Sequence, residues 1–139
     1  MRECRRVARA GATIALTTNL QGHMQEFYAA FEAVLRPDER VRLKEHVAYR
    51  ATIDGVRALL EKSGFNVTRV IERTGFMRFA NGRALFNHHF IKLGFLDAWK
   101  SVVAGREREA FEQLVEKLDG AGELRLTIPM AYVEAVVRR

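Results

Sequence analysis

The sequence predicts an α/β fold with a small mixed sheet, and three observations lead to this prediction. Segments rich in apolar and β-branched residues lie at about 12–18, 66–80 and 123–137, where they indicate strands. Between these segments, apolar residues recur at the spacing of amphipathic helices. The chain has 139 residues, of which 48% are hydrophobic, and this is enough for one packed core. We therefore expect a single domain over residues 1–139, with elements in the order β-α-α-α-β-α-α-β.

The first strand, at about 12–18, reads ATIALTT and is apolar or β-branched throughout. Such a continuous run is typical of a strand in a parallel sheet that is covered on both faces. The chain then passes through NLQG at 19–22 into a helix at about 23–35, which Pro37 ends because proline cannot continue the hydrogen-bond ladder. The apolar positions of this helix follow the i, i+3, i+4, i+7 pattern: Met24, Phe27, Tyr28, Phe31, Val34 and Leu35.

Two more helices are expected before the second strand, at about 38–48 and 53–63. Thr52 is a candidate N-cap of the second of them, because its hydroxyl can accept a hydrogen bond from the first turn. Gly64 follows the last turn and can adopt the left-handed conformation that commonly ends a helix.

The segment that follows the second strand is expected to be helical. Asn81-Gly82 is a turn signal that would mark a hairpin if a strand came next, but residues 83–103 have the pattern of a helix. A further amphipathic helix is expected at about 106–118. We therefore expect a helical insertion over about 83–118, between the second and third strands.

The last strand, at about 123–137, alternates between apolar and other residues. Pro129 lacks a backbone N–H and indicates a bulge or a locally unpaired edge within this strand. The residues expected to share one face are Leu124, Leu126, Ile128, Met130 and Tyr132.

Charge and composition exclude several functions. The net charge of +6 and the pI of about 10.0 raise nucleic acid as a partner, but the arginines are scattered and no nucleic-acid-binding motif is present. No apolar run approaches the length of a membrane span. The lone Cys4 cannot form an internal disulfide, and we expect a cytoplasmic protein without a Cys-built metal site.

Several stretches, taken in order, resemble the C-terminal half of class I, Rossmann-like S-adenosylmethionine-dependent methyltransferases. RRVARAGATIALTTNL resembles the leader helix, glycine turn and fifth strand of that family. TIDGVRALLEKSGFNVTRV resembles its later helix, Gly-Phe turn and sixth strand, and LRLTIPMAYVEAVVR resembles its antiparallel seventh strand. NHHFIKLGFLDAW resembles the substrate-side cap of many members that act on small molecules. The usual Pro-Gly-Gly turn is replaced by Arg9-Ala10-Gly11-Ala12.

The resemblance implies a truncated Rossmann-like fold and methyl transfer from S-adenosylmethionine to a small molecule. We expect no metal, because the adjacent His88 and His89 would point about a hundred degrees apart on a helix and could not both bind one ion. The family's cofactor motif is a glycine-rich turn between a strand and a helix, where the backbone approaches the ligand closely. Gly120-Ala121-Gly122 is the only G-x-G in the chain and leads into a strand. Two possibilities stay open: the chain is part of a working enzyme, or it is a non-catalytic remnant that serves as a small-ligand-binding or dimerisation module.

The resemblance also implies a partner. In the family, the strand equivalent to 12–18 lies between a fourth strand, which is missing here, and the antiparallel last strand. We therefore expect an apolar sheet edge at 12–18 that pairs with another chain. The expected partner is a second copy of the chain, giving a homodimer, or a missing N-terminal half.

Candidate site residues follow from the rule that ligands bind beyond the carboxyl ends of parallel strands. This rule places Thr18 and Asn19 at the mouth of a pocket, where they would contact the cofactor, and Asn19 would also contact the substrate. His23 is a candidate general base because an imidazole titrates near neutral pH. Seven further residues could line a substrate pocket: Phe27, Phe86, His88, His89, Trp99, Met130 and Tyr132.

Overall fold

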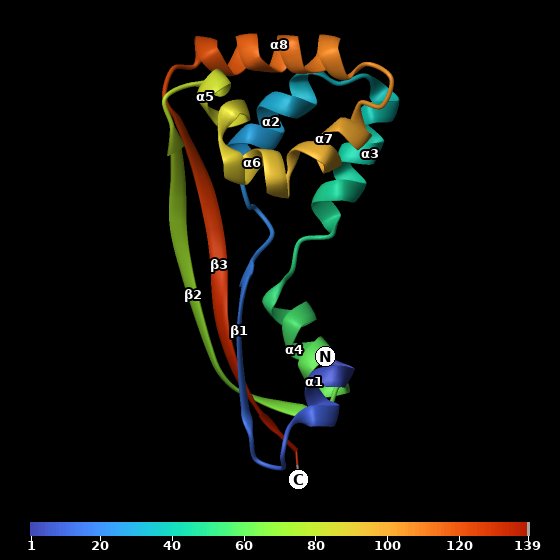
Figure 1. Cartoon of the computed structure of the whole chain (residues 1–139), viewed down its shortest axis with the longest axis vertical. Coiled ribbons are helices and arrows are strands. Elements are labelled where there is room, and N and C mark those ends of the chain that lie inside the picture. Colours follow the sequence, from blue (N-terminus) through green and yellow to red (C-terminus); the bar gives the residue numbers. More distant parts are fainter. Residues whose placement is uncertain (139) are drawn as a thin grey trace. The chain divides into compact units, whose positions relative to one another are not determined.

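The computed structural model describes residues 1–138 as eight helices and a three-stranded sheet (Figure 1). All three predicted strands are confirmed, each to within one residue at both ends. The elements, in order, are α1 (Arg2–Val7), β1 (Thr13–Asn19), α2 (Gln25–Val34), α3 (Pro37–Ala48), α4 (Ile53–Lys62), β2 (Phe65–Phe79), α5 (Gly82–Asn87), α6 (His89–Gly94), α7 (Leu96–Val102), α8 (Glu107–Gly120) and β3 (Leu124–Val137).

The chain divides into two compact units. Unit 1 consists of Met1–His23, Arg50–Gly75 and Ile128–Arg139. Unit 2 consists of Met24–Tyr49 and Phe76–Thr127, and therefore contains the predicted helical insertion at 83–118. The strands β2 and β3 each contribute residues to both units.

The strand order is β1-β3-β2, and β3 runs antiparallel to β1, as predicted for the last strand. Their register pairs Thr13 with Val136 and Asn19 with Met130. Pro129 lies one position beyond the last pair, and its carbonyl oxygen accepts a hydrogen bond of 2.8 Å from the backbone N–H of Leu20. The strand β1 is therefore an edge strand of the described sheet, with β3 as its neighbour.

The prediction that β1 is a parallel strand buried on both faces is wrong. Its neighbour is antiparallel, and its side chains alternate between exposed and half-buried. Ile14 and Leu16 pack against the core, whereas Thr13, Ala15 and Thr17 are exposed. Threonine and alanine are compatible with either environment, so composition alone could not show that one face is open.

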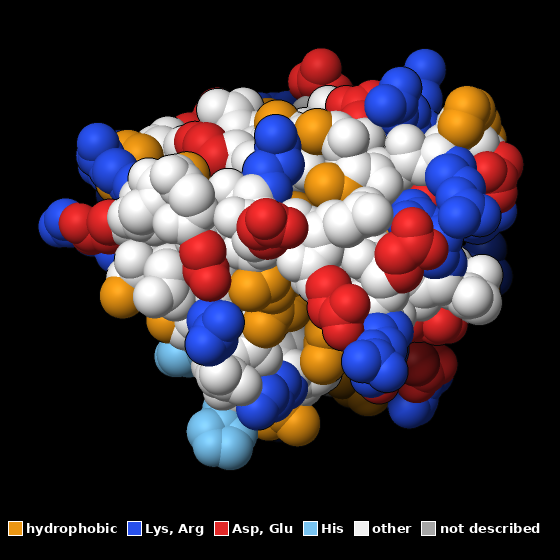
Figure 2. Space-filling model, turned by 90° about the horizontal axis from the view of Figure 1, so that it is seen from above, with side chains coloured by type: hydrophobic (Ala, Val, Ile, Leu, Met, Phe, Trp, Pro, Cys, Tyr) orange, Lys and Arg blue, Asp and Glu red, His pale blue; other side chains and the backbone are white. Residues whose placement is uncertain are grey.

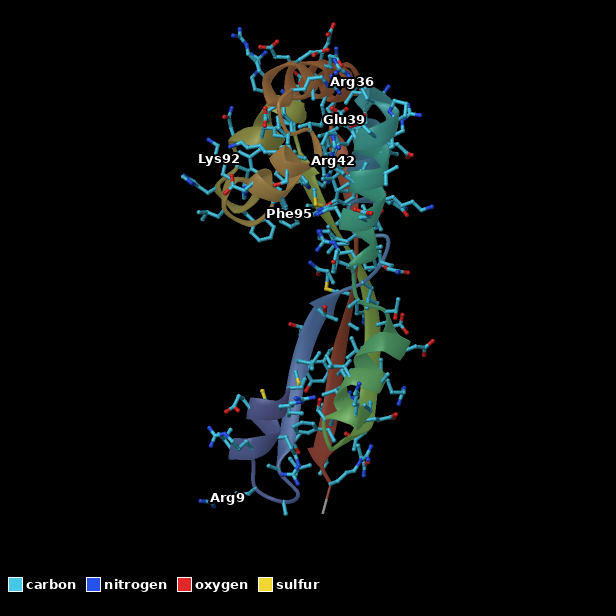
Figure 3. The ribbon with its side chains drawn as sticks, turned by 90° about the vertical axis from the view of Figure 1, so that its right-hand side faces the viewer. Arg9, Arg36, Glu39, Arg42, Lys92 and Phe95 are labelled. Atoms are coloured by element: carbon cyan, nitrogen blue, oxygen red, sulfur yellow. The ribbon has the colours of Figure 1, made fainter. Side chains whose placement is uncertain are left out.

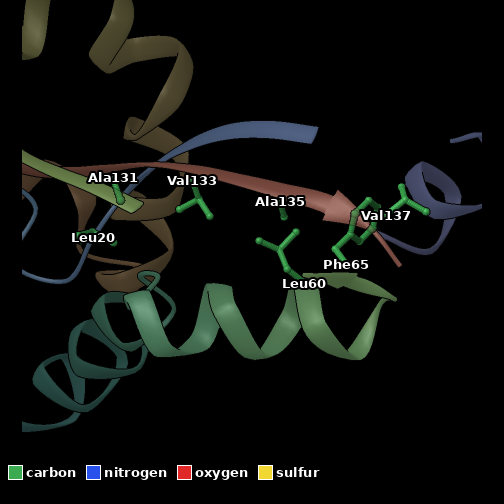
Figure 4. Packing of buried hydrophobic residues seen from close by; sticks show 7 residues of the cluster. All are labelled: Leu20, Leu60, Phe65, Ala131, Val133, Ala135 and Val137. Atoms are coloured by element: carbon green, nitrogen blue, oxygen red, sulfur yellow. The ribbon is translucent and has the colours of Figure 1, made fainter. Parts of the chain in front are cut away.

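The core of unit 1 forms where α4 packs against β3 (Figure 4). The sequence explains both ends of α4: the Thr52 hydroxyl accepts a hydrogen bond from the backbone N–H of Gly55 at 3.0 Å, and Gly64 has a φ of +88°. The buried residues of this core are Leu20, Leu60, Phe65, Ala131, Val133, Ala135 and Val137.

The core of unit 2 is a cluster of aromatic rings from α2, α5, α7 and α8. Phe27 stacks on Trp99 with ring centroids 4.1 Å apart, and Phe31 stacks on Phe111 at 6.0 Å. Phe86 meets Phe111 edge to face at 5.4 Å. These contacts contribute packing and ring electrostatics together, and they join helices that are distant in sequence.

The predicted long helix at 83–103 is instead three short helices, α5, α6 and α7. His88 breaks the first from the second: its backbone is extended, with φ −71° and ψ 131°, and its ring Nδ1 accepts a hydrogen bond from the Phe90 N–H at 3.3 Å. Phe95, with φ −134°, separates the second from the third. The apolar spacing survives across these breaks, which is why periodicity could not reveal them.

The alternation predicted for the last strand also changes within it. Leu124, Leu126 and Ile128 are buried as predicted, but the buried positions then shift to the odd-numbered residues from Ala131 to Val137. Tyr132 is therefore not one of the buried residues of β3. The shift lies beside Pro129, where the sequence had indicated an irregularity.

Candidate functional site

Three predicted site residues lie at the end of β1 in unit 1. Thr18 and Asn19 are half-buried, and the Thr18 hydroxyl donates to the carbonyl oxygen of Asn19 at 3.2 Å. The turn that follows contains Gly22, whose φ of +87° requires the freedom of glycine, and it ends at His23, which is 2% exposed.

Burial, together with a smaller effect of the positive charge of Arg50, lowers the pKa of His23 from 6.5 to about 4. Desolvation penalises the charged imidazolium, so this ring is neutral at pH 7. A general base works best when its pKa is near the working pH. His23 is therefore a weak proton acceptor, and its environment suits a neutral hydrogen-bonding group better than a base.

Two further predicted residues lie on β3, next to the end of β1. Met130 is paired with Asn19, and Tyr132 is paired with Thr17. The Tyr132 hydroxyl donates to Glu134 at 2.5 Å, and this hydrogen bond raises the pKa of the phenol. The sheet thus brings Asn19 and Met130 together.

In unit 2, Phe27 and Trp99 are fully buried members of the aromatic core. The Trp99 indole N–H donates to the Tyr28 hydroxyl at 3.2 Å, which in turn lies 3.2 Å from Nε2 of His46. These contacts give both rings a clear structural role.

The two adjacent histidines are exposed and do not act as a pair. The His88 ring caps α6 and meets the Phe79 ring edge to face, with centroids 5.6 Å apart. His89 is the first residue of α6 and is exposed. In the part of the chain that the structure describes, no three His, Cys, Asp or Glu residues are grouped closely enough to hold a metal ion.

A groove between α5, α7 and α8, which we call the helical groove, is a candidate site for a small molecule within unit 2. Its volume is about 690 Å³, within the range of small-molecule sites. Figure 2, which looks onto α8, shows hydrophobic side chains surrounded by charged ones. The apolar lining comes from Phe86, Leu96, Phe111 and Val115.

Charged side chains of both signs form the rim of the helical groove. Nε of Arg108 lies 2.9 Å from a carboxylate oxygen of Glu112, and Asp119 accepts a hydrogen bond from the backbone N–H of Arg83 at 3.1 Å. Lys100 and Glu116 also line it. The apolar lining can therefore contact an apolar part of a small molecule, and the rim can pair with a positive or a negative group on the same molecule.

Apart from Phe86, the sequence analysis did not identify the helical groove. The sequence does contain a signal for the groove on the helix predicted at 106–118. There, Phe111 and Val115, which are half-buried, share one helical face with the charged residues Arg108 and Glu112.

A second pocket, of about 350 Å³, lies between α2, α8 and the start of β3, and Phe27 contributes to its wall.

A buried ion pair joins the start of α3 to the start of α8. Arg106 meets Glu39 in a bidentate contact, with N–O distances of 3.0 and 2.5 Å, and also donates to the carbonyl oxygen of Val34. Figure 3 labels Glu39 near the start of α3. The hydrogen bond from Arg106 lowers the pKa of Glu39. Removal of either residue would leave the other as a buried charge without its partner, which is costly. The contact therefore holds the start of α8 against the start of α3. No local sequence signal marks it, because the two residues are far apart in the chain.

Comparison with known proteins finds likenesses among solved structures. No family model matches the chain, and no curated protein does. The chain is similar to the crystal structure of a candidate sarcosine dimethylglycine methyltransferase from Galdieria sulphuraria, with 14% identity and a TM-score of 0.39. The match covers 99% of this chain and 46% of that protein, so the chain spans less than half of its length. At these values the likeness does not by itself assign a family or an activity.

Proposed function

We propose that this chain is the acceptor-binding part of an S-adenosylmethionine-dependent methyltransferase that acts on a small molecule. The proposal rests on the stretches that resemble the C-terminal half of this enzyme family. It is supported by the sheet, in which the strand at 13–19 lies beside an antiparallel last strand, as the resemblance implies.

The helical groove is the proposed acceptor site. It lies in the helices that follow β2, the segment that resembles the substrate-side cap, and this location is the observation that carries the proposal. Methyl transfer needs an acceptor held in a fixed orientation and shielded from water. The apolar floor can exclude water, and the charged rim can orient a polar acceptor.

The described residues do not fit a complete site for S-adenosylmethionine. Thr18 and Asn19 lie where the resemblance places cofactor contacts, but the turn after β1 contains Gly22 alone. Gly120 and Gly122 lie between a helix and a strand, the reverse of the order that the cofactor motif requires. We therefore propose that the cofactor is held mainly by residues outside this chain.

The second candidate function is a ligand-binding module without methyl transfer, and the incomplete cofactor site favours it. Both functions require binding in the helical groove. They differ because only a methyltransferase needs S-adenosylmethionine, so stoichiometric binding of that cofactor in calorimetry would exclude the second candidate.

Binding in the helical groove can be tested with Val115→Trp. The indole would occupy the groove without removing a core side chain, because Val115 is half-buried on its wall. We expect nitrogen-15 NMR with a library of small amines, phenols and thiols to shift amide signals of α5, α7 and α8. In Val115→Trp, at least about ten times more ligand should be needed to produce the same shifts.

The matched control is Val41→Trp, which adds the same ring to an exposed position of α3. It should bind like the unmodified chain. Ligands that shift only residues outside α5, α7 and α8, or that bind Val115→Trp as well as the original chain, would refute the helical groove as the site.

A further inference from the structure

In the described residues, the outer edge of β1 is open from Thr13 to Thr17; at its end, Leu20 bridges to Ala51, and the backbone N–H of Gln21 donates to the carbonyl oxygen of Ala51 at 3.0 Å. Ala12 accepts a hydrogen bond from Val137, and Leu20 donates one to Pro129, so the even-numbered residues between them face β3. The N–H and C=O groups of the odd-numbered residues therefore point outward. These residues are Thr13, Ala15, Thr17 and Asn19.

This edge lacks the features that normally prevent strand pairing. Edge strands are usually protected by charged residues, prolines or bulges. Residues 10–25 contain no Lys, Arg, Asp or Glu, the longest such run in the sequence. By contrast, β2 at the other side of the sheet carries Arg69, Glu72 and Arg73, all exposed.

We propose that β1 is the contact through which two copies of this chain associate, strand against antiparallel strand. A two-fold axis at Ala15 pairs Thr13 with Thr17 of the other copy and Ala15 with itself. In this register each outward-facing residue of the open part, from Thr13 to Thr17, enters a hydrogen-bonded pair.

The side chains support this self-pairing. The register places Ile14 opposite Leu16 of the other copy, in a pair of the type where side chains lie closest. Ile14 and Leu16 already pack on the core of unit 1, so pairing extends that apolar face from one copy to the next. No charged residue lies on either strand, and no like charges are brought opposite each other.

The charge of unit 1 determines how this association depends on salt. Eleven of the 23 Lys and Arg residues but only five of the 17 Asp and Glu residues belong to unit 1, which therefore carries the whole net charge of +6. Two copies repel each other, and β1 is the uncharged stretch at which they can meet. Because salt screens this repulsion, we expect the dimer to strengthen several-fold between about 0.05 and 0.5 M salt.

The test is sedimentation velocity over about 1 to 100 μM chain. We expect a concentration-dependent rise from the monomer mass of 15.9 kDa to twice that value. Ala15→Pro removes an outward N–H and leaves the bonds of Ile14 and Leu16 to β3 intact, so it should stay monomeric. Ala15→Val keeps the N–H and should dimerise like the original chain.

A second variant decides the matter if Ala15→Pro does not fold. Thr17→Lys places a charge on the open edge and should weaken the dimer at least about tenfold, whereas Thr74→Lys adds the same charge to β2 and should not. A chain that is monomeric at every concentration and salt level, or a dimer that both β1 variants leave unchanged, would overturn the proposal.

Discussion

His23 shows at the scale of one residue how burial redefines a chemical group. From the sequence it is a candidate base beside a strand end, with an ordinary pKa. In the structure it is 2% exposed, and its pKa falls to about 4. Burial thus makes His23 a neutral polar group within unit 1, rather than the base suited to neutral pH that the sequence suggests.

This shift predicts a pH dependence of stability. Between pH 6.5 and about 4 the unfolded chain binds a proton at His23 and the folded chain does not, so stability falls as pH falls through this window. The loss should approach about 3 kcal/mol at most and be absent above pH 6.5. Urea unfolding of the chain and of His23→Gln at several pH values measures it, because the variant should show a smaller slope.

A direct check is the pH titration of the His23 ring by NMR. We expect a midpoint near 4. A midpoint near the ordinary value of 6.5 would contradict the buried environment and restore His23 as a base suited to neutral pH.

At the scale of elements, Gly82 controls how closely α5 approaches α8. A Cβ added there would lie 2.7 Å from Cβ of Leu118 and 3.2 Å from the carbonyl oxygen of Val115. Because Val115 also lines the helical groove, this close approach helps define its wall.

Gly82→Ala should therefore destabilise the chain by about 1–3 kcal/mol, as overpacking does in other cores. Thermal unfolding followed by circular dichroism measures the change. Gly94→Ala is the control, because a Cβ there meets nothing within 4 Å. Equal stability of the two variants would mean that α5 and α8 can separate without cost.

The sequence predicts most elements because their signals are local. The strands follow from β-branched runs, and α4 follows from Thr52 and Gly64 at its ends. The breaks at His88 and Phe95 escape prediction, because each leaves the apolar spacing intact. The open face of β1 escapes it too, since burial depends on which elements pack there rather than on the strand itself.

The candidate site is less predictable than the fold for the same physical reason. Phe27 and Trp99 are large apolar residues at helical spacing, and the structure places them in the core. The helical groove joins residues from three helices, and the Arg106–Glu39 pair joins two more distant segments. Only the packed chain brings such residues together, whereas Asn19 and Met130 meet through a strand pairing that the resemblance implied.

At the scale of the whole molecule, chemistry is divided between the two units. Unit 1 carries the net charge, the open strand edge and the predicted residues Thr18, Asn19 and His23. Unit 2 has no net charge and contains the helical groove. Association and ligand binding can therefore be altered separately, by Ala15→Pro in one unit and Val115→Trp in the other. Among the described residues, no helix is both long and apolar enough to cross a membrane.

The central claim is that this chain binds the acceptor for methyl transfer. The most direct measurement is transfer of a labelled methyl group from S-adenosylmethionine to small molecules in a lysate of the cells that produce the chain, with its gene deleted and the purified chain added back. We expect labelled small molecules that require the chain and that are lost with Val115→Trp but kept with Val41→Trp. Labelling that is independent of the chain, or unchanged by Val115→Trp, would contradict it.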